Sequence, residues 1–205
     1  LRRAGAPVYM TVATTEKVPR GVPLVSRGTA GHGTAPRMDN AVVHLAWAVA
    51  RVAEWQPPMR LNDTTRSYFE RLAAISSPDE ARRYREIVLP DKAPAIENYF
   101  REHEITHNSM LRTSISPNVI KAGFRSNVIP SEAEAILDIR ALPDEDMEQF
   151  YQSLRRVIHD PRIEVVANRG GRPAGRPTRL DTELFRVLEA TQKKIYPGAV
   201  TLPSM

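Results

Sequence analysis

Residues 132–140 alternate between polar and apolar side chains, which is the pattern of a β-strand with one buried face. One side of the pattern holds Ala133, Ala135, Leu137 and Ile139, and the other holds Glu132, Glu134, Ile136, Asp138 and Arg140. A strand of this kind is typical of an antiparallel sheet that is covered on one face and wetted on the other. We therefore expect a sheet of this type, covered by amphipathic helices.

Two helices are expected to provide that cover. Apolar residues recur at helical spacing from Asp39 to Trp55, and the pair Pro57-Pro58 follows them. A second helix is expected after Pro143, where acidic residues would complement the positive end of the helix dipole. Further segments rich in β-formers lie at 8–13, 22–30, 110–115, 119–125 and 163–166.

The order of these elements is strand, helix, strands, helix, strand. It predicts an α+β fold, namely a ferredoxin-like βαββαβ sandwich in which an antiparallel sheet carries its helices on one face. Residues 59–109 are helical in pattern and strongly charged, and they are expected to form a helical insertion. Within it, Ser77 suits an N-cap and Pro78 suits the first helical position.

The C-terminal part of the chain has a different character. Residues 168–179 are rich in Gly, Pro and Arg and are typical of an inter-domain linker. One amphipathic helix is expected around 184–195, followed by a short strand at 200–203. Because this tail has no evident surface of its own to pack on, we expect it to belong to another domain.

The composition excludes several classes of function. The chain has no cysteine, which excludes disulfides, thiol nucleophiles and thiolate metal sites and favours a cytoplasmic protein. Its net charge of +5 comes from dispersed basic residues without interleaved aromatic residues, so no nucleic-acid partner is expected. No apolar run is long enough to span a membrane, and no membrane partner is expected. The first residues do not resemble a signal peptide, and the chain, which lacks an initial Met, is expected to be an internal piece.

One segment matches a zinc motif. Residues 103–107, His-Glu-Ile-Thr-His, have the form H-E-x-x-H, in which two histidines bind one zinc and the glutamate is the general base. A zinc helix is normally buried and apolar, whereas this segment is polar on both sides. Glu134 and Asp138 have a ligand-like spacing, but their segment alternates like a strand. A solvated helix is the favoured interpretation, and a single-zinc protease that uses His103 and His107 is an alternative.

Two motifs far apart in the chain carry most of the functional information. The first is the Gly-rich segment 28–36, which has the form G-x-x-x-H-x-T-x-P around His32. The second begins with Asn-Val-Ile-Pro at 127–130 and continues to Asp-Ile-Arg at 138–140. In this order and context they resemble the lid, or dimerisation, domain of a family of two-zinc metallopeptidases and deacylases. That family includes acetylornithine deacetylase, succinyl-diaminopimelate desuccinylase, glutamate carboxypeptidase and aminoacylase.

The resemblance implies roles for three residues. His32 would reach into the partner subunit's active site and donate a hydrogen bond to the substrate carbonyl oxygen, a contribution of about 3 kcal/mol in the transition state. Arg140 would bind the free carboxylate of the substrate through its planar fork, and Asn127 would add a side-chain hydrogen bond. From the residues alone, His32 could also be an ordinary loop histidine, and Arg140 could be paired with Asp138 or Glu134.

The resemblance also implies where the metal lies. The family binds two zinc ions through an upstream His-x-Asp, a bridging Asp, a Glu-Glu pair, a further acid and a His near the C-terminus. This chain has no His-x-Asp and no Glu-Glu pair, so none of its residues is assigned to metal. Zinc is expected in the full-length enzyme only. Residues 17–168 would form the lid domain, with the helical insertion at 59–109, and residues 1–16 and 169–205 would belong to the catalytic domain.

The predicted function is that of the lid and dimerisation domain of a zinc-dependent peptidase or amidohydrolase that cleaves an amide bond next to a free carboxylate. Carboxypeptidases, dipeptidases and N-acyl-amino-acid deacylases fit this description. The expected substrate is a small peptide or an N-acyl amino acid, the expected assembly is a homodimer, and the chain alone would be inactive. A non-catalytic dimerisation module is the alternative from another class. An exposed sheet edge and the helix with Trp47 would be its contact surfaces.

Overall fold

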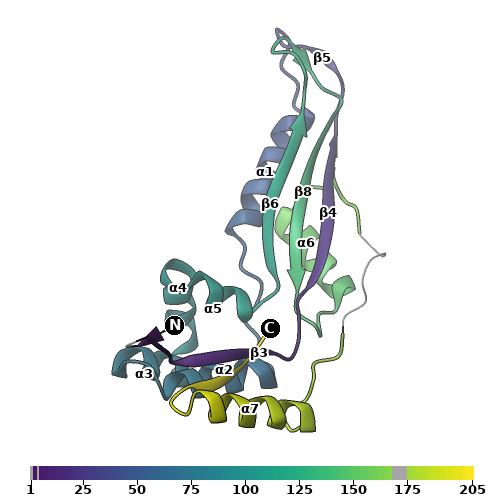
Figure 1. Cartoon of the computed structure of the whole chain (residues 1–205). Helices are drawn as coiled ribbons and strands as arrows, with labels where there is room; N and C mark the ends of the chain where they lie inside the picture. The colour runs from purple at the N-terminus through teal and green to yellow at the C-terminus, as the bar shows by residue number, and fades with distance from the viewer. Residues whose placement is uncertain (1, 4, 168–174) are drawn as a thin grey trace. The chain divides into compact units, whose positions relative to one another are not determined.

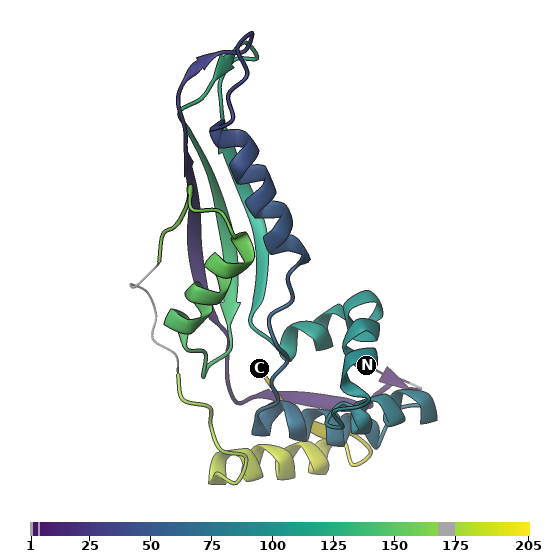
Figure 2. The ribbon, with the colours of Figure 1, turned by 180° about the vertical axis from the view of Figure 1, so that it is seen from behind.

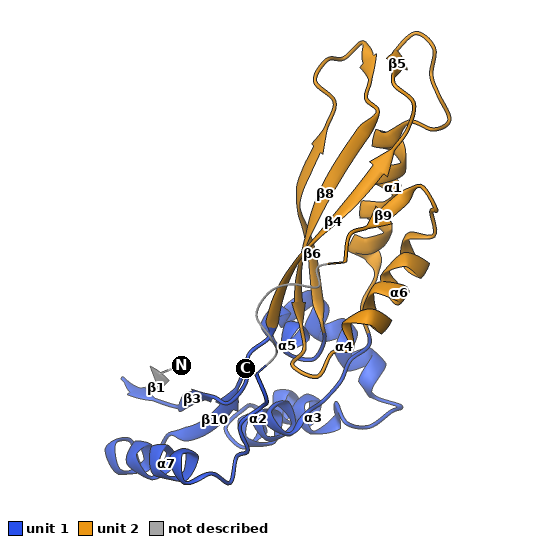
Figure 3. Cartoon of the chain, turned by 90° about the vertical axis from the view of Figure 1, so that its right-hand side faces the viewer, with its two compact units in different colours: residues 1–17, 58–112, 175–205 blue, residues 18–57, 113–174 orange. Residues whose placement is uncertain are grey.

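The computed structural model describes residues 2–3, 5–167 and 175–205. The chain divides into two compact units, each assembled from separate stretches of sequence (Figure 3). Unit 1 comprises residues 1–17, 58–112 and 175–205, and unit 2 comprises residues 18–57 and 113–174. Both motifs of the sequence analysis lie in unit 2.

Unit 2 is an α+β unit with a four-stranded antiparallel sheet, so the predicted fold class is confirmed at this level. Its strands lie side by side in the order β6-β8-β4-β9, and their bounds are Ser114–Ala122 for β6, Glu132–Ala141 for β8, Val18–Arg27 for β4 and Ile163–Val165 for β9. The helices α1 (Ala41–Glu54) and α6 (Met147–Ile158) lie on the same side of the sheet (Figures 1 and 2).

The core of unit 2 lies between the sheet and its helices. The predicted apolar side of residues 132–140 is confirmed, because Ala133, Ala135, Leu137 and Ile139 are each at most 1% exposed. They pack against side chains of β4, α1 and α6 that include Leu24, Leu45 and Leu154. Burial of one large apolar side chain contributes about 1.5–3 kcal/mol to stability.

Strand β4 differs from the predicted strand 22–30, because it begins at Val18 and runs through Pro19 and Pro23. Proline cannot donate to a strand ladder. The carbonyl oxygen of Pro23 accepts a hydrogen bond from Val166 N at 3.0 Å, so the backbone of Pro23 faces the β9 side. Pro19 lies four residues before Pro23, so its backbone faces the same side of β4. On that side β9 pairs only with residues 24–26 of β4. Neither proline therefore removes a bond from the long ladder to β8.

Strand β6 corrects a second prediction. The two strands expected at 110–115 and 119–125 form one strand from Ser114 to Ala122, and Met110 instead ends a helix. The register with β8 shifts between Pro117 and Val119, which is the mark of a β-bulge. Pro117 thus interrupts the ladder without turning the chain.

A part-buried hydrogen-bonded pair joins α1 to the turn before β9. His44 Nδ1 lies 2.6 Å from the Asp160 carboxylate, and the two side chains are 13% and 10% exposed. His44 Nε2 lies 3.0 Å from the carbonyl oxygen of Met38. Burial raises the pKa of the Asp160 carboxyl, but hydrogen bonds from His44 and from the Arg162 N–H outweigh it, so the net pKa lies below the ordinary value. The ionised carboxylate of Asp160 is therefore favoured in the folded state.

The lowered pKa of Asp160 predicts a loss of stability in acid. The carboxylate contributes its stabilisation above the unfolded pKa, about 3.9, and loses it as the pH falls through the lower folded value. Asp160→Asn should cost about 1–2 kcal/mol at pH 7 and should flatten the dependence of the unfolding free energy on pH below about 4. Urea unfolding followed by tryptophan fluorescence measures this in unit 2 alone, because the only tryptophans, Trp47 and Trp55, lie there. An unchanged slope below pH 4 in the variant would contradict the assignment.

Unit 1 holds the remaining helices and a short sheet. Its helices are α2 (Asp63–Ala73), α3 (Pro78–Glu86), α4 (Ala93–His103), α5 (Ile105–Met110) and α7 (Glu183–Ile195). Its strands are β1 (Arg2–Arg3), β2 (Ala6–Pro7), β3 (Tyr9–Ala13) and β10 (Val200–Ser204). Strand β10 pairs in parallel with β3, and β1 pairs with β2. The predicted cap of α3 is present, because Ser77 and Glu80 form a capping box and Pro78 occupies the first turn.

The helices within residues 59–109 and the C-terminal tail lie in the same unit. The helices within residues 59–109 share one apolar core with Leu202 of β10, so they group with the terminal stretches in unit 1. The C-terminal tail has partners within this unit. Arg71 of α2 donates to the carboxylate of Glu189 on α7 at 2.6 Å and to the carbonyl oxygen of Thr201 on β10 at 2.9 Å. The tail therefore belongs to the same core as residues 59–109.

Two observations complete the fold. Most of the predicted linker 168–179, namely residues 168–174, lies outside the described residues. In the stretches that the structure describes, no helix is long and apolar enough to cross a membrane.

Candidate functional site

The two motifs meet at one end of unit 2. The short strands β5 (Gly31–His32) and β7 (Val128–Ile129) pair antiparallel, with His32 opposite Val128. Beyond the last pair, Gly33 N donates to the carbonyl oxygen of Asn127 at 2.8 Å. His32 and Asn127 therefore lie one register position apart on neighbouring backbone segments, although about a hundred residues separate them in sequence. We call this end of unit 2, residues 28–39 and 123–131, the tip.

The loop that carries His32 is held at its base. The Asp39 carboxylate accepts from the Thr29 hydroxyl at 2.6 Å, from Thr29 N at 3.1 Å and from Arg37 Nε at 3.1 Å. The hydrogen bond from the Thr29 side chain is the main reason why the pKa of Asp39 falls to about 2. At the same place a Cβ on Gly28 would lie 1.8 Å from the carbonyl oxygen of Asp39. Only glycine allows this approach, which explains the first residue of the motif.

The side chains of the tip are open to solvent. His32 is exposed, and its Nδ1 lies 3.0 Å from Thr34 Oγ1 and 3.3 Å from Thr34 N. Asn127 and Arg125 are also exposed, and Phe124 is 77% exposed. Phe124 and Arg125 were not predicted as functional residues, because a loop of the form G-F-R-S has no periodicity that could mark them. The tip thus presents a hydrogen-bonding imidazole, an amide, a cation and an aromatic ring.

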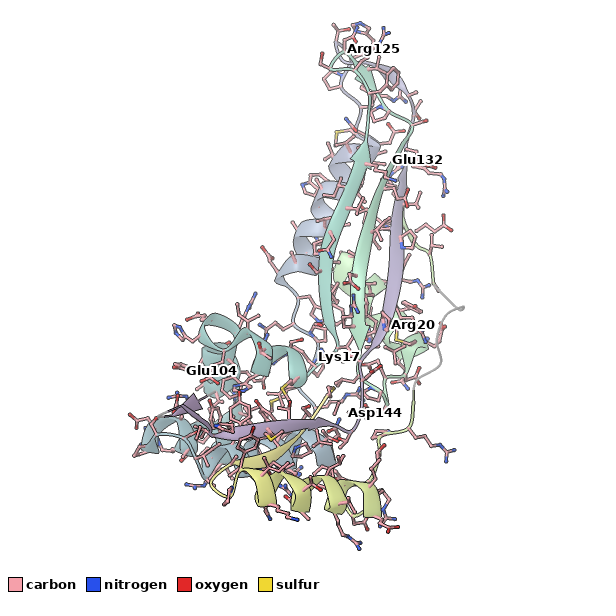
Figure 4. The ribbon with its side chains drawn as sticks, in the orientation of Figure 1. Lys17, Arg20, Glu104, Arg125, Glu132 and Asp144 are labelled. Carbon is pink, nitrogen blue, oxygen red and sulfur yellow. The ribbon has the colours of Figure 1, made fainter. Side chains whose placement is uncertain are left out.

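Arg140 lies at the opposite end of the sheet. It is the register partner of Pro19 on β4 and of Ser114 on β6. Strand β8 spans about 26 Å between Glu132 and Arg140, at about 3.3 Å per residue. Figure 4 marks both ends of the sheet, with Arg125 in the tip loop and Arg20, the register partner of Ile139, at the far end. The structure therefore brings His32 and Asn127 together and keeps Arg140 apart from them.

The guanidinium of Arg140 is paired with Asp138 on the same face of β8. Arg140 Nε lies 2.9 Å from Asp138 Oδ1, and Nη2 lies 3.0 Å from Oδ2. A pairing of Arg140 with Asp138 was one of the two alternatives expected from the residues alone. The Arg140 side chain is 53% exposed, and Nη1 makes no hydrogen bond with Asp138. One N–H edge of the fork is thus available to an anion from solution.

The H-E-x-x-H segment does not form a zinc helix. The chain leaves helical geometry at Glu104, between α4 and α5, so His103 and His107 lie on different helices. His107 Nδ1 lies 2.5 Å from the Glu104 carboxylate and Nε2 lies 3.1 Å from the Tyr68 hydroxyl, whereas the His103 ring lies tilted against the ring of Tyr99. Among the described residues, no group of three or more His, Asp or Glu side chains is placed to hold a metal ion.

The environment of His107 explains the motif in structural terms. Its ring packs against four aromatic rings in the core of unit 1, those of Tyr68, Phe69, Tyr84 and Phe100. The Tyr84 hydroxyl also donates to Glu104 at 3.1 Å, and burial is the main cause that raises the pKa of Tyr68 to about 12. Glu104 and His107 thus serve as internal hydrogen-bonding partners.

The fold and the paired motifs define a class of protein, namely an α+β module that presents a polar tip. Comparison with known families identifies it further. The family model described as the peptidase dimerisation domain matches residues 16–165. The chain therefore belongs to the M20 peptidase dimerisation domain family, and the resemblance that rested on the two motifs is confirmed.

The relatives are peptidases and amide hydrolases of greater length. "Probable carboxypeptidase S-like 2" of Dictyostelium discoideum is 25% identical over 195 residues, which cover 95% of this chain and 37% of that protein. Human "N-fatty-acyl-amino acid synthase/hydrolase PM20D1" is 24% identical over 197 residues, which cover 94% of this chain and 38% of that protein. The chain thus spans less than two fifths of the length of these relatives.

Solved structures share the fold. The M20 family metallo-carboxypeptidase Sso-CP2 from Sulfolobus solfataricus has a TM-score of 0.55 and 17% identity, and covers 98% of this chain and 54% of its own. Human carnosine dipeptidase 1 has a TM-score of 0.52 and 12% identity, and covers 96% of this chain and 45% of its own. At these identities the similarity concerns the fold alone.

Proposed function

We propose that this chain is the lid and dimerisation part of a zinc-dependent peptidase or amidohydrolase that cleaves an amide bond next to a free carboxylate. The substrate would be a small peptide or an N-acyl amino acid. Two zinc ions would polarise the carbonyl group and activate water in the intact enzyme, and their ligands would lie outside this chain. The observation that carries the proposal is that the pairing of β5 with β7 brings His32 close to Asn127 at the tip of a peptidase dimerisation domain.

The separation of Arg140 from the tip indicates how an active site would be shared. A dipeptide spans about 7 Å, at 3.3–3.6 Å per residue, whereas β8 alone places Arg140 about 26 Å from Glu132, which borders the tip. Within one copy, Arg140 and His32 are too far apart to hold the same small substrate. In a twofold dimer, the tip of one copy can serve the site that the other copy builds around its own Arg140. His32 and Asn127 would then act in trans, and Arg140 in cis.

The chemistry of the three residues suits this division. His32 would donate to the carbonyl oxygen of the scissile amide as negative charge develops on it. The Asn127 side chain would add a second hydrogen bond. Arg140 would bind the free carboxylate of the substrate through the N–H groups that Asp138 leaves available.

Unit 2 has a surface that suits contact with a second copy. The solvent-facing side of α1 is apolar over most of its length, with Val42, Val43, Ala46, Trp47, Ala50 and Ala53 exposed. The helix packs beside β6, an edge strand of the sheet, where Ile120 is 59% exposed. An uncovered apolar helix next to an open strand edge is typical of an isologous interface. We propose that this surface, α1 with the β6 edge, joins two copies.

Trp47 should carry much of the dimer energy, because it is large, central in α1 and 53% exposed. Trp47→Glu is expected to raise the dissociation constant of the dimer by about 30-fold or more. Sedimentation velocity over a concentration series measures this on the 205-residue chain. Leu184→Glu is the matched control, since Leu184 is 67% exposed on α7 of unit 1. A wild-type chain that stays monomeric at high concentration would contradict the proposal.

Replacement of Arg140 tests the substrate-binding role. In the intact enzyme, Arg140→Ala should raise KM for carboxylate substrates by about 10- to 100-fold, because one charge-assisted hydrogen-bonded pair is lost. Arg156→Ala, which removes an exposed arginine of α6, should leave KM unchanged. An unchanged KM in Arg140→Ala would show that the guanidinium only pairs with Asp138.

The proposal extends to topology and domain organisation. We propose that unit 2 is a ferredoxin-like βαββαβ sandwich. The chain order β4, α1, β6, β8, α6, β9 and the sheet order β6-β8-β4-β9 support it. We further propose that unit 2 is the lid and that the terminal stretches of unit 1 belong to the catalytic domain of the intact enzyme.

A further inference from the structure

Two groups of Thr34 lie within hydrogen-bonding distance of the same ring nitrogen of His32. The backbone N–H of Thr34 points at Nδ1 over 3.3 Å, and the Thr34 hydroxyl lies 3.0 Å from the same atom. A backbone amide can only donate, so Nδ1 must accept and carries no proton. The proton of the neutral ring therefore lies on Nε2, and no residue of the described chain is bonded to that atom.

We infer that Thr34 is a positioning residue that locks His32 in its Nε2–H tautomer, so that the tip offers a hydrogen-bond donor and not a base. This inference rests on the proposed function, because it specifies how His32 would act on a substrate. It assigns to Thr34 a task that the family motif and the comparisons leave open.

The tautomer decides the sign of the interaction with a substrate oxygen. In the Nε2–H form, the outward nitrogen attracts an oxygen that gains negative charge. In the Nδ1–H form, the outward nitrogen presents a lone pair, which repels that oxygen, and the ring N–H meets the N–H of Thr34. The partner that fits His32 is therefore an acceptor oxygen, such as the carbonyl oxygen of an amide.

The backbone around the ring is fixed, which makes the lock effective. Ala35 N donates to the carbonyl oxygen of His32 at 3.0 Å, and Gly33 N donates to Asn127 at 2.8 Å. The residues on both sides of Thr34 are thus tied down, and its N–H and hydroxyl stay directed at Nδ1. A side chain without a hydroxyl would leave only the longer backbone contact.

The ring nitrogens can be observed directly. The 205-residue chain, labelled with ¹⁵N-histidine, would be studied by NMR at pH 8.5, where ordinary histidine with a pKa of about 6.5 is neutral. His32 would be assigned by the loss of its signals in His32→Gln. We expect His32 to be predominantly Nε2–H. His159, which is exposed and whose ring has no partner in the described chain, should show a solvent-like mixture.

Substitutions at Thr34 and Thr29 distinguish an effect of the Thr34 hydroxyl on the His32 tautomer from an effect of the loop conformation. Thr34→Val should raise the ratio of Nδ1–H to Nε2–H in His32 about threefold, equivalent to about 0.65 kcal/mol at 25 °C, and Thr34→Ser should restore the wild-type ratio. Thr29→Val removes a hydroxyl that binds Asp39 in the same loop, and it should leave the ratio unchanged. Dispersed amide spectra would verify that each variant is folded.

Two results would overturn the inference: a wild-type His32 with the mixture of His159, or a Thr34→Val ratio equal to that of the wild type. The measurement needs neither substrate nor dimer, so it is separable from the proposed function. A locked His32 in a chain that never dimerises would count against the proposed function and would leave the role of Thr34 intact.

Discussion

Replacing His32 with alanine in the intact enzyme is expected to lower kcat by about 10²- to 10³-fold and to change KM by less than about threefold. An imidazole donor that contacts the carbonyl oxygen gains strength only as negative charge develops there, so its loss affects the transition state more than the ground state. The exposed position of His32 at the tip, with Nδ1 turned inward to Thr34, is consistent with this role. Steady-state kinetics on a panel of N-acyl amino acids and dipeptides, with zinc content measured in parallel, would check it.

The control is a second exposed histidine. His103→Ala should leave kcat and zinc content unchanged, because the His103 side chain is 57% exposed and contacts only the ring of Tyr99 and the carboxylate of Glu102 among the described residues. The same variant tests the single-zinc alternative, which predicts loss of one zinc per chain. A normal kcat in His32→Ala would remove the oxyanion role. A rise in KM alone would make His32 a ground-state binding residue.

The fold was predictable where local chemistry determined it. The alternation at 132–140 identified β8 and its buried face, because a strand has a side-chain period of two. The cap at Ser77 placed the start of α3 for a similar local reason. The bounds of β4 and β6 differ from the predicted strands, and both strands contain proline. A proline breaks a strand only when its missing N–H belongs to the ladder, and the side of the ladder depends on partners far away in sequence.

The candidate site was predictable as residue types and not as an arrangement. His32, Asn127 and Arg140 were all predicted from motifs. The strands β5 and β7 were not predicted, because two residues are too few to show a strand periodicity. Their pairing depends on contacts between distant segments. The pairing of Arg140 with Asp138 could be foreseen, because residues two apart in a strand share a face. The helices of 59–109 were recognised, but their partners in unit 1 are distant in sequence and left no signal.

If two copies share each active site, mixed dimers of two inactive variants should distinguish a site built from both copies from a site built within one copy. At substrate concentrations well below KM, mixed dimers of His32→Ala and Arg140→Ala should recover about a quarter of the wild-type activity when the copies are combined in equal amounts. In the hybrid dimer, one site receives an intact Arg140 from its own copy and an intact His32 from the other, and the second site lacks both. Half of the dimers are hybrids, and each hybrid has one complete site. Activity measured after co-refolding at varied mixing ratios should follow this binomial dependence.

A pair of tip variants provides the matched control. His32 and Asn127 lie on neighbouring backbone segments of the same tip, so both would enter the same site from the same copy. A hybrid of His32→Ala and Asn127→Ala leaves one defect in each site and should not recover activity. If Arg140 and His32 served the site of a single copy, their hybrid would also stay inactive. Recovery in the first pair together with none in the second requires that the two ends of β8 serve different active sites.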